Sequence, residues 1–312
     1  MQTLSPLPHF PIIITGCRRS GTTLLRTMLE QHSKLYVHPQ EPQFIQQLAR
    51  RFGPQIHAPH TAVDLILSHP YCPPVVTAPS FQTVLQGRPS LSLPELIQAY
   101  LTVWAGEHLQ TRHPVLKDPA WIFHLDWVQA WFPQGKIIHI VRDPRANVSS
   151  QRARWPKASV YECAIWWRDA VRAGHTLALQ KPQVCFELIY EALVTEPEET
   201  LSRLCDFLAI PFEPQMLTFD LDTPTYAPGE APKRTRFTRP DPARLQLWQD
   251  HLSPADIRLI EKICAPEMTW WHYLPSTPPV SPLALTGKYL LQRSSFTLLK
   301  TARTLRDRLQ RS

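Results

Sequence analysis

Two arginines and three hydroxyl side chains are crowded into one turn near the start of the chain. The turn, GCRRSGTT, runs from Gly16 to Thr23 and has its second glycine at Gly21. A β-branched apolar run at 12–15 precedes it and predicts a buried parallel strand. Apolar residues at helical spacing follow from Thr22 and predict a helix. The backbone amides of such a loop and of the helix N-terminus converge on an anion, and phosphate is the usual one.

The loop differs from the Walker A loop of NTP-hydrolysing proteins. The glycine spacing is the same, but Thr22 stands where the Walker lysine belongs, and the cations Arg18 and Arg19 precede the second glycine. A mixed phosphate–sulfate anhydride fits this loop better, because Arg19 can reach the bridging region. The residues expected to hold a 5′-phosphate are Ser20, Gly21, Thr22 and Thr23. Another kind of phosphate-binding turn is the alternative for the loop taken alone.

A second cationic cluster follows another apolar run, at 136–141. Arg142 comes directly after this predicted strand, Ser150 lies eight positions later, and Arg154 lies on the same helical face as Ser150. Two guanidinium groups and a hydroxyl suit a clamp for a second, isolated phosphate. A surface ion-pair network is the alternative, and the glycine loop upstream makes the clamp the favoured interpretation.

Alternating strands and helices must position these clusters. Strands are predicted at 12–15, at 35–37, up to 117, at 136–141 and at 184–188; helices are predicted from 22, at 43–51, 61–68, 93–110 and 121–131, up to about 153, and at 159–180 and 198–208. This order predicts an α/β protein, a P-loop-like three-layer sandwich with a central parallel sheet flanked by helices. Ligands of such sheets bind at the C-terminal ends of the strands, where the glycine loop, Lys117 and the segment 142–150 all lie.

The composition predicts an ordinary globular protein, with 43% hydrophobic and 19% charged residues among 312. No apolar run is long enough to span a membrane and no signal-peptide pattern is present, so we expect a cytoplasmic protein. The six cysteines are scattered, so we expect reduced thiols, no metal site and no catalytic role for Cys17. Seven Lys/Arg and one Asp fall within 288–312, so most of the net charge of +7 lies there and nucleic acid is not an expected partner.

We expect one domain over 10–275 and a basic tail over 276–312. Within the domain, the proline-rich stretch 53–91 is interpreted as an irregular cap over the sheet, where acceptor specificity would lie. The spacing of apolar residues and arginines in the tail predicts a basic amphipathic helix that could make peripheral contact with an anionic membrane. A helix packed on its own domain, or a frayed end, is the favoured alternative.

The two phosphate motifs carry a family resemblance. RSGTTLLRTML resembles the 5′-phosphosulfate loop, and strand-RDPR-x-x-x-x-S resembles the 3′-phosphate motif, of the sulfotransferase superfamily that uses PAPS (3′-phosphoadenosine 5′-phosphosulfate). The run 117–150 and the phrase FELIYEALVTEPEETLSRLCDFLAIPF resemble tyrosylprotein sulfotransferases and their bacterial relatives. The similarity spans about residues 10–270. It implies a PAPS-dependent sulfotransferase that releases PAP, the desulfated nucleotide, and needs no metal.

The resemblance implies a role for each site residue. Glu41 is the implied general base, although its phrase HPQEP is one residue longer than usual and a proline follows it. Arg19 and Lys117 would stabilise the charge on the departing phosphate, and Tyr190 would lie near the nucleotide. Arg239 lies in a late basic segment that resembles the loop closing over the nucleotide, and is expected on the 3′-phosphate side.

Histidine is not the expected base. Sulfotransferases of small phenols and steroids use a histidine two residues after a lysine that resembles Lys117, but position 119 of this chain is proline. We expect structural roles for His38, His124 and His139.

The predicted reaction is transfer of a sulfuryl group from PAPS to a hydroxyl by a single in-line displacement. The resemblance allows a protein tyrosine, a glycan, a lipid or a small molecule as acceptor, and the expected cytoplasmic location favours a small molecule or glycan. One alternative is a P-loop-type nucleotide kinase, which the missing Walker lysine disfavours. The other is a non-catalytic module that binds PAP or a phosphorylated partner.

Overall fold

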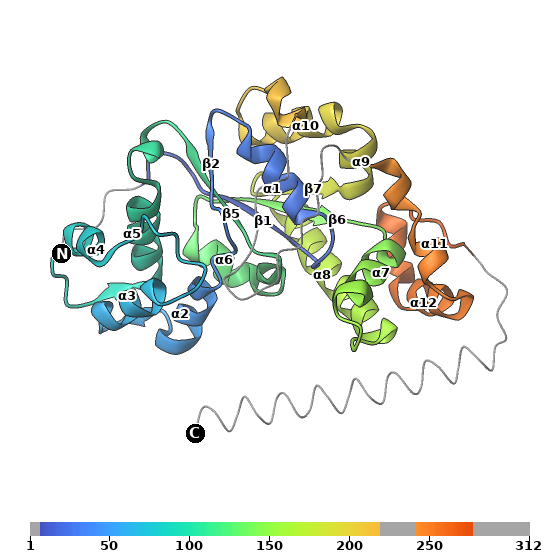
Figure 1. Cartoon of the computed structure of the whole chain (residues 1–312), viewed down its shortest axis with the longest axis horizontal. Helices are drawn as coiled ribbons and strands as arrows, with labels where there is room; N and C mark the ends of the chain where they lie inside the picture. Colours follow the sequence, from blue (N-terminus) through green and yellow to red (C-terminus); the bar gives the residue numbers. More distant parts are fainter. Residues whose placement is uncertain (1–6, 219–240, 277–312) are drawn as a thin grey trace, which may run out of the picture.

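The fold is built on a five-stranded sheet in which every neighbouring pair of strands is parallel (Figure 1). The computed structural model describes residues 7–218 and 241–276. The strand order is β2-β5-β1-β6-β7, with bounds Leu35–Val37, His113–Lys117, Ile12–Gly16, Lys136–Val141 and Cys185–Ile189 respectively. The predicted central parallel sheet flanked by helices is therefore confirmed, and each strand lies where an apolar run predicted one.

Helices cover both faces of this sheet (Figure 1). In the described residues they are α1 (Thr22–Glu30), α2 (Phe44–Phe52), α3 (Pro59–Leu67), α4 (Ala78–Leu85), α5 (Leu93–Ala105), α6 (Leu125–Trp131), α7 (Pro144–Arg154), α8 (Val160–Gln180), α9 (Tyr190–Thr195), α10 (Pro197–Leu208), α11 (Trp248–His251) and α12 (Pro254–Trp270). Short 3₁₀ turns add η1 (Gly106–Gln110), η2 (Pro119–His124), η3 (Pro214–Leu217) and η4 (Pro242–Leu245).

Two α-helices are shorter than predicted. The helix predicted at 93–110 stops as an α-helix at Ala105, because Gly106 takes a left-handed φ of 51° and the chain continues as a 3₁₀ turn. The helix predicted at 121–131 begins as the 3₁₀ turn η2, in which Ala120 N donates to the Asp118 side chain, and becomes α-helical only from Leu125.

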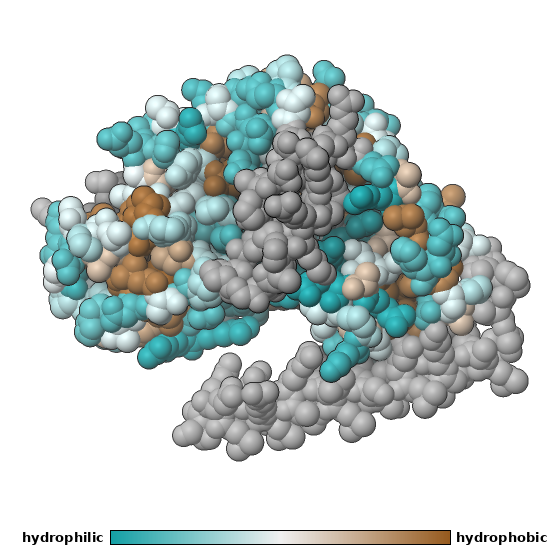
Figure 2. Space-filling view, viewed as in Figure 1, coloured by the Kyte–Doolittle hydropathy of each residue, from teal (hydrophilic) through white to brown (hydrophobic). Residues whose placement is uncertain are grey.

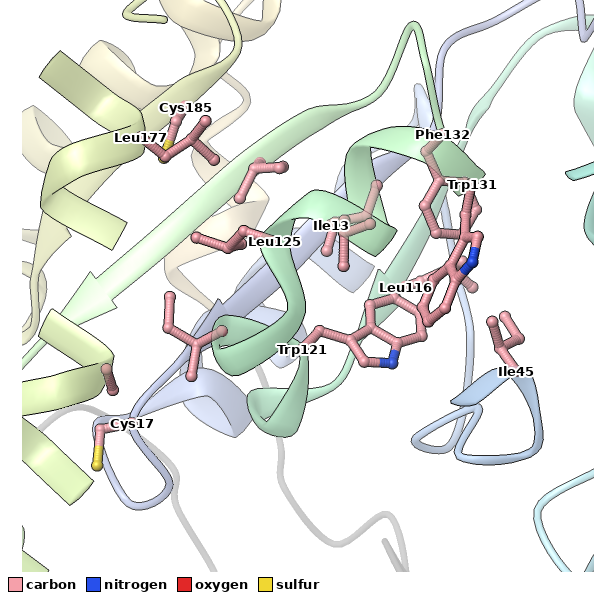
Figure 3. Packing of buried hydrophobic residues seen from close by; sticks show 14 of the residues in the cluster. Ile13, Cys17, Ile45, Leu116, Trp121, Leu125, Trp131, Phe132, Leu177 and Cys185 are labelled. Carbon is pink, nitrogen blue, oxygen red and sulfur yellow. The ribbon is translucent and has the colours of Figure 1, made fainter. Parts of the chain in front are cut away.

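Side chains alternate along β1 and pack against the helices on both faces of the sheet. Ile12 and Ile14 belong to an apolar cluster with α1, α9 and α10, whereas Ile13 belongs to the cluster with α5, α6 and α8. All three isoleucines are fully buried, which is why the strand reads as a continuous apolar run. Figure 3 shows Ile13 and Leu116 packed beside Trp121 and the end of α6.

The stretch 53–91 is more regular than expected, and the helix predicted at 61–68 is present as α3. This stretch contains α3, α4 and a two-stranded antiparallel sheet, β3 (Gln55–Ile56) with β4 (Leu91–Ser92). Its prolines do not break the helices, because α3 and α4 each carry one in the first turn, where no helical hydrogen bond is lost. Figure 2 shows apolar side chains gathered on the surface of this side of the molecule, over helices α3 to α5.

Two predictions fall outside the described residues. The first is Arg239 with its basic segment, and the second is the tail with its amphipathic helix, from residue 277 onward. Among the helices that the structure does describe, none combines the length and the apolar character needed to cross a bilayer.

Gly174, in the middle of α8, allows the helix to lie against β6. A Cβ at this position would lie 2.1 Å from Nδ1 of the fully buried His139 ring. That ring cannot move freely, because His139 Nδ1 also lies 3.1 Å from Oε1 of Glu187 on β7.

We predict that Gly174→Ala lowers the free energy of unfolding by about 1–3 kcal/mol, because the added methyl group overpacks the α8–β6 contact. At the exposed Thr176 of the same helix, the Ala variant should instead be more stable than the Gly variant by about 1 kcal/mol. Urea denaturation of the wild type, Gly174→Ala, Thr176→Ala and Thr176→Gly measures both differences. A Gly174→Ala protein at least as stable as the wild type contradicts the prediction.

Candidate active site

The glycine loop between β1 and α1 has the backbone geometry of an anion-binding turn. Gly16 and Gly21 have φ of 147° and 100°, and Arg19 takes a left-handed φ of 72°. The loop is closed by a hydrogen bond from Ser20 N to Cys17 O at 3.1 Å. Helix α1 starts directly after it, and no side chain caps its first amides. These amides and the positive end of the α1 dipole are therefore available to an anion.

Two amide side chains of helix α7 hold the glycine loop through hydrogen bonds. Asn147 Nδ2 donates to Ser20 Oγ at 2.9 Å and to Arg18 O at 3.0 Å. Gln151 Nε2 in turn donates to Asn147 Oδ1 at 2.6 Å. Cys17 lies between them, and burial raises the pKa of its thiol, so this sulfur is a protonated packing group.

The end of β6 delivers Arg142 beside the glycine loop. The ring of Tyr190, the first residue of α9, lies against both groups: the Arg142 guanidinium stands 4.5 Å from the ring centroid. A Cβ on Gly21 would lie 2.2 Å from Cδ2 of the same ring. Trp167 Nε1 of α8 donates to Arg142 O at 2.8 Å and fixes its backbone.

The two predicted phosphate clusters touch one another. Arg19 Nε donates to Ser150 Oγ at 3.1 Å, and Arg142 Nη1 donates to Arg19 O at 3.1 Å. Desolvation and the like charges of Arg142 and Arg154 lower the pKa of Arg19. In the part of the chain that the structure describes, no carboxylate pairs with Arg19 or Arg142. This concentration of positive charge is suited to a ligand with several negative charges.

Glu41 and Lys117 form an ion pair at the neighbouring strand end. Lys117 is the last residue of β5, and its Nζ donates to Glu41 Oε1 at 2.6 Å; Gln43 Nε2 donates to the other carboxylate oxygen at 3.2 Å. The Glu41 side chain keeps 30% of its surface exposed, so a substrate can reach it. Burial alone would raise the pKa of Glu41, but the ammonium of Lys117 outweighs it and the pKa lies below its usual value.

The turn that carries Glu41 is held by two buried side chains. Arg26 of α1 donates to His38 O and to Pro39 O. The His38 ring lies 2.6 Å from Tyr100 Oη of α5 and 2.7 Å from Gln40 O. Burial lowers the pKa of His38 to about 4, so its ring is neutral and holds the turn through these hydrogen bonds.

The predicted structural histidines are all engaged in packing or hydrogen bonds. His38 braces the turn before Glu41, His139 contacts Glu187 inside the sheet, and the His124 ring stacks on Trp127 with centroids 4.7 Å apart. No described group of three or more His, Cys, Asp or Glu side chains has an arrangement that could hold a metal ion.

Helix α12 supports the second phosphate cluster from behind. Arg145 pairs with Asp143 and with Glu261 of α12, at 2.6 and 3.0 Å. Glu191 accepts hydrogen bonds from Asp143 N at 3.0 Å and from Tyr273 Oη at 2.7 Å. The carboxylates near the RDPR segment are therefore occupied by these partners.

The residues fit a nucleotide that carries a phosphate at each end. The uncapped α1 amides with Ser20, Thr22 and Thr23 suit one phosphate, and Arg142 with Ser150 suits the other. Nε of Arg142 is buried and has no hydrogen-bond partner among the described residues, as expected of a donor that serves a ligand. Of the predicted site residues, Arg239 alone falls outside what the structure describes.

Sequence reasoning missed the residues that support the site. Arg26 and Asn147 lie inside the segments that carry the family resemblance, but only the fold shows that they and Gln151 hold the glycine loop and the turn before Glu41. Asp118 is next to Lys117 in the sequence, but only the fold shows that its side chain is buried, with 1% of the residue surface exposed.

Comparison with known proteins agrees with this geometry. The model of the sulfotransferase family matches residues 11–214. Protein-tyrosine sulfotransferase 1 of Danio rerio is 28% identical over 223 residues, which cover 66% of this chain and 55% of that protein. Omega-hydroxy-beta-dihydromenaquinone-9 sulfotransferase Stf3 of Mycobacterium bovis is 26% identical, with 64% of this chain and 63% of that protein covered. The chain thus spans about half the length of several curated relatives that it matches.

Solved structures share the fold. The sulfotransferase domain from the curacin biosynthetic pathway superimposes with a TM-score of 0.59 at 21% identity. The superposition covers 86% of this chain and 99% of that domain. The sulfotransferase domain of the Synechococcus PCC 7002 olefin synthase gives the same TM-score at 23% identity, over 88% of this chain and 99% of that domain.

We predict that Gly21→Ala weakens the binding of PAP, the nucleotide expected from the sequence, at least about tenfold, because the new methyl group collides with Tyr190 and the backbone is strained at φ 100°. Gly53→Ala is the matched control: Gly53 also has a positive φ, 68°, but nothing lies within 4 Å of the added Cβ. Titration calorimetry with PAP measures both affinities. Equal affinities in the two variants would contradict the role of the Gly21–Tyr190 contact.

Proposed function

The chain belongs to the sulfotransferase family, and on that premise we propose that it transfers the sulfuryl group of PAPS to an acceptor hydroxyl, with Glu41 as general base. The observation that carries the proposal is the placement of the Glu41–Lys117 pair at the same sheet edge as the joined phosphate clusters. Donor and acceptor chemistry can therefore share one site.

The donor half consists of two anion sites of different kinds. The α1 amides and the hydroxyls of Ser20, Thr22 and Thr23 would hold the 5′-phosphosulfate, and Arg142 with Ser150 would hold the 3′-phosphate. Arg19 belongs to the first site and its Nε donates to Ser150 Oγ of the second, which supports assigning its guanidinium to the bridging oxygen. Arg154 adds charge on the same side, and Tyr190 gives the nucleotide an aromatic surface.

The acceptor half depends on Glu41. PAPS supplies an activated sulfuryl group on a phosphate leaving group. As a new S–O bond forms to the acceptor and the bond to the phosphate oxygen breaks, the acceptor hydroxyl proton passes to a carboxylate oxygen of Glu41. Arg19, Lys117 and the loop amides stabilise the negative charge that develops on the departing phosphate.

Lys117 has to serve two partners in this mechanism. In the structure its ammonium neutralises Glu41, which keeps the carboxylate a weak base. If Lys117 turns toward the leaving group during transfer, Glu41 loses its compensating charge and gains affinity for a proton. One lysine can thus connect leaving-group stabilisation to activation of the base.

The acceptor itself is proposed only as a class. The names of the relatives mention protein tyrosine and a hydroxylated menaquinone, both of which present a hydroxyl. Incubating the protein with PAPS carrying radioactive sulfur and an extract of its own cells, then identifying the labelled product, tests the function and finds the acceptor together. Turnover of ATP with magnesium in place of label transfer would favour a nucleotide kinase.

We predict that Glu41→Gln lowers label transfer to the extract by about 10²–10⁴-fold, because the amide cannot accept the proton. The affinity for PAP should stay within about twofold of the wild type, since Glu41 does not belong to either phosphate cluster. Gln43→Ala, which removes only the neighbouring hydrogen bond to Glu41, is the milder control. Wild-type label transfer by Glu41→Gln would favour a module that binds PAP without catalysis.

We predict that Lys117→Met lowers turnover more than it lowers PAPS affinity and moves the acidic limb of the rate profile to higher pH. Lys117 holds the pKa of Glu41 down against the effect of burial, so its removal raises that pKa and the base is ionised only at higher pH. Rates of label transfer across pH measure the limb. An unmoved limb, or a loss confined to PAPS affinity, contradicts the role given to Lys117.

A further inference from the structure

Asp118 is a buried carboxyl next in sequence to the partner of Glu41, and it has no task in the mechanism above. It follows Lys117 at the end of β5 and is 1% exposed. Its amide donates to Ile14 O at 3.1 Å, and its carbonyl accepts from Thr15 Oγ1 at 3.0 Å. These bonds to β1 fix the backbone, and burial keeps the carboxyl out of reach of an acceptor.

The two carboxyl oxygens of Asp118 have different surroundings. Oδ1 accepts a hydrogen bond from Ala120 N at 2.9 Å and caps the 3₁₀ turn η2. Oδ2 is buried and has no hydrogen-bond partner among the described residues. The cap needs only one oxygen, which an amide side chain would supply equally well. A second, unpartnered carboxylate oxygen in the interior is costly, so its presence calls for a reason beyond capping.

We propose that Asp118 is a positioning residue for the transfer, a second carboxyl that acts through Glu41 and sets how strong a base Glu41 is. The proposal rests on the function proposed above, in which Glu41 takes the proton of the acceptor. Lys117, the residue before Asp118, pairs with Glu41 at 2.6 Å. The charges that act on Asp118 are those of Glu41 from the turn before α2, Lys117 from β5 and Arg18 from the glycine loop. A negative charge on Asp118 disfavours a negative charge on Glu41 and so raises its affinity for a proton.

Asp118 has a pKa close to neutral pH. Burial raises the pKa of Asp118 to about 7, and the charge of Glu41 adds to the rise, while Ala120 N, Lys117 and Arg18 oppose it. Two carboxyls that interact in this way lose their protons in two steps, Glu41 first and Asp118 near neutral pH. Below the second step the pair carries one charge; above it, Asp118 strengthens Glu41 as a base.

The variant Asp118→Asn isolates the charge. Asparagine keeps the Oδ1 cap on Ala120 N and the shape of the side chain, but it cannot ionise. It therefore imitates the protonated form of Asp118 at every pH. The transfer rates of the wild type and the variant should be alike at low pH and diverge as the pH passes through about 7.

The first experiment uses stability and needs no acceptor. Folded wild-type protein keeps the Asp118 proton up to about pH 7, whereas the unfolded chain loses it near pH 4, so this group makes folding less favourable as the pH rises between them. The melting temperature of Asp118→Asn minus that of the wild type should rise by at least about 2 °C from pH 5 to pH 8. In a Glu41→Gln background the rise should be smaller, because the charge of Glu41 is one of its causes. An absent rise, or an equal rise in both backgrounds, overturns the coupling of the two carboxyls.

The second experiment measures initial rates of label transfer from radioactive PAPS to the cell extract. The ratio of the Asp118→Asn rate to the wild-type rate should be near one at about pH 5.5 and fall to about one third to one tenth at pH 8.5. A defect in folding alone gives a ratio that does not change with pH in this direction. Glu95→Gln, which alters a capping carboxylate of α5 that contacts Ser92 and Arg88, is the control and should give a flat ratio.

The outcomes separate the two proposals. Undiminished label transfer by Glu41→Gln overturns the proposed function, and the role of Asp118 falls with it. An inactive Glu41→Gln together with a flat Asp118→Asn ratio overturns the role of Asp118 alone. An inactive Glu41→Gln, a falling ratio and a pH-dependent gain in stability together support both.

Discussion

The contact between β1 and β6 at Gly16 is the constraint on which the candidate site depends. The two strands run in parallel register, Gly16 is paired with Ile140, and a Cβ on Gly16 would lie 2.5 Å from Ile140 O. With the strands this close, Arg142 leaves β6 beside the glycine loop that leaves β1. The bonds from Arg19 to Ser150 and from Arg142 to Arg19 then join segments more than a hundred residues apart.

Charge is distributed unevenly along this edge. On the β6 side, Arg19, Arg142 and Arg154 gather around the phosphate clusters, while the nearby acids Asp143 and Glu191 are held by other partners. On the β5 side, Lys117 pairs with Glu41, the acid proposed as general base. Binding of an anionic donor and removal of a proton from an acceptor require opposite local charge, and the sheet separates them by the width of one strand, β1.

The sequence was most informative where a motif and an element coincide. The glycine loop and the RDPR segment each follow an apolar run, so the parallel sheet and the meeting of the two clusters could both be predicted. The domain limits and the chemical roles of the site residues stay predictions. The regular structure of 53–91 was underestimated because the stretch is rich in proline, whereas the prolines of α3 and α4 occupy first turns.

The supporting residues could not be found in the same way. Asn147 and Gln151 matter because one face of α7 lies under the glycine loop, and that depends on how α7 packs rather than on any local pattern. The task proposed for Asp118 likewise depends on burial and on the charge of Glu41, two properties of the folded chain. Local patterns report which groups could react, and packing decides what surrounds them.

The guanidinium of Arg26 joins the helix of the phosphate loop to the turn that carries Glu41. The carboxylate is thereby tied to the framework of the nucleotide half, independently of α3 and α4. The sequence of those two helices, where acceptor specificity is expected, can then change while the geometry between the glycine loop and Glu41 stays the same. Under the proposed function, one nucleotide-binding framework could therefore be combined with different acceptor-binding surfaces.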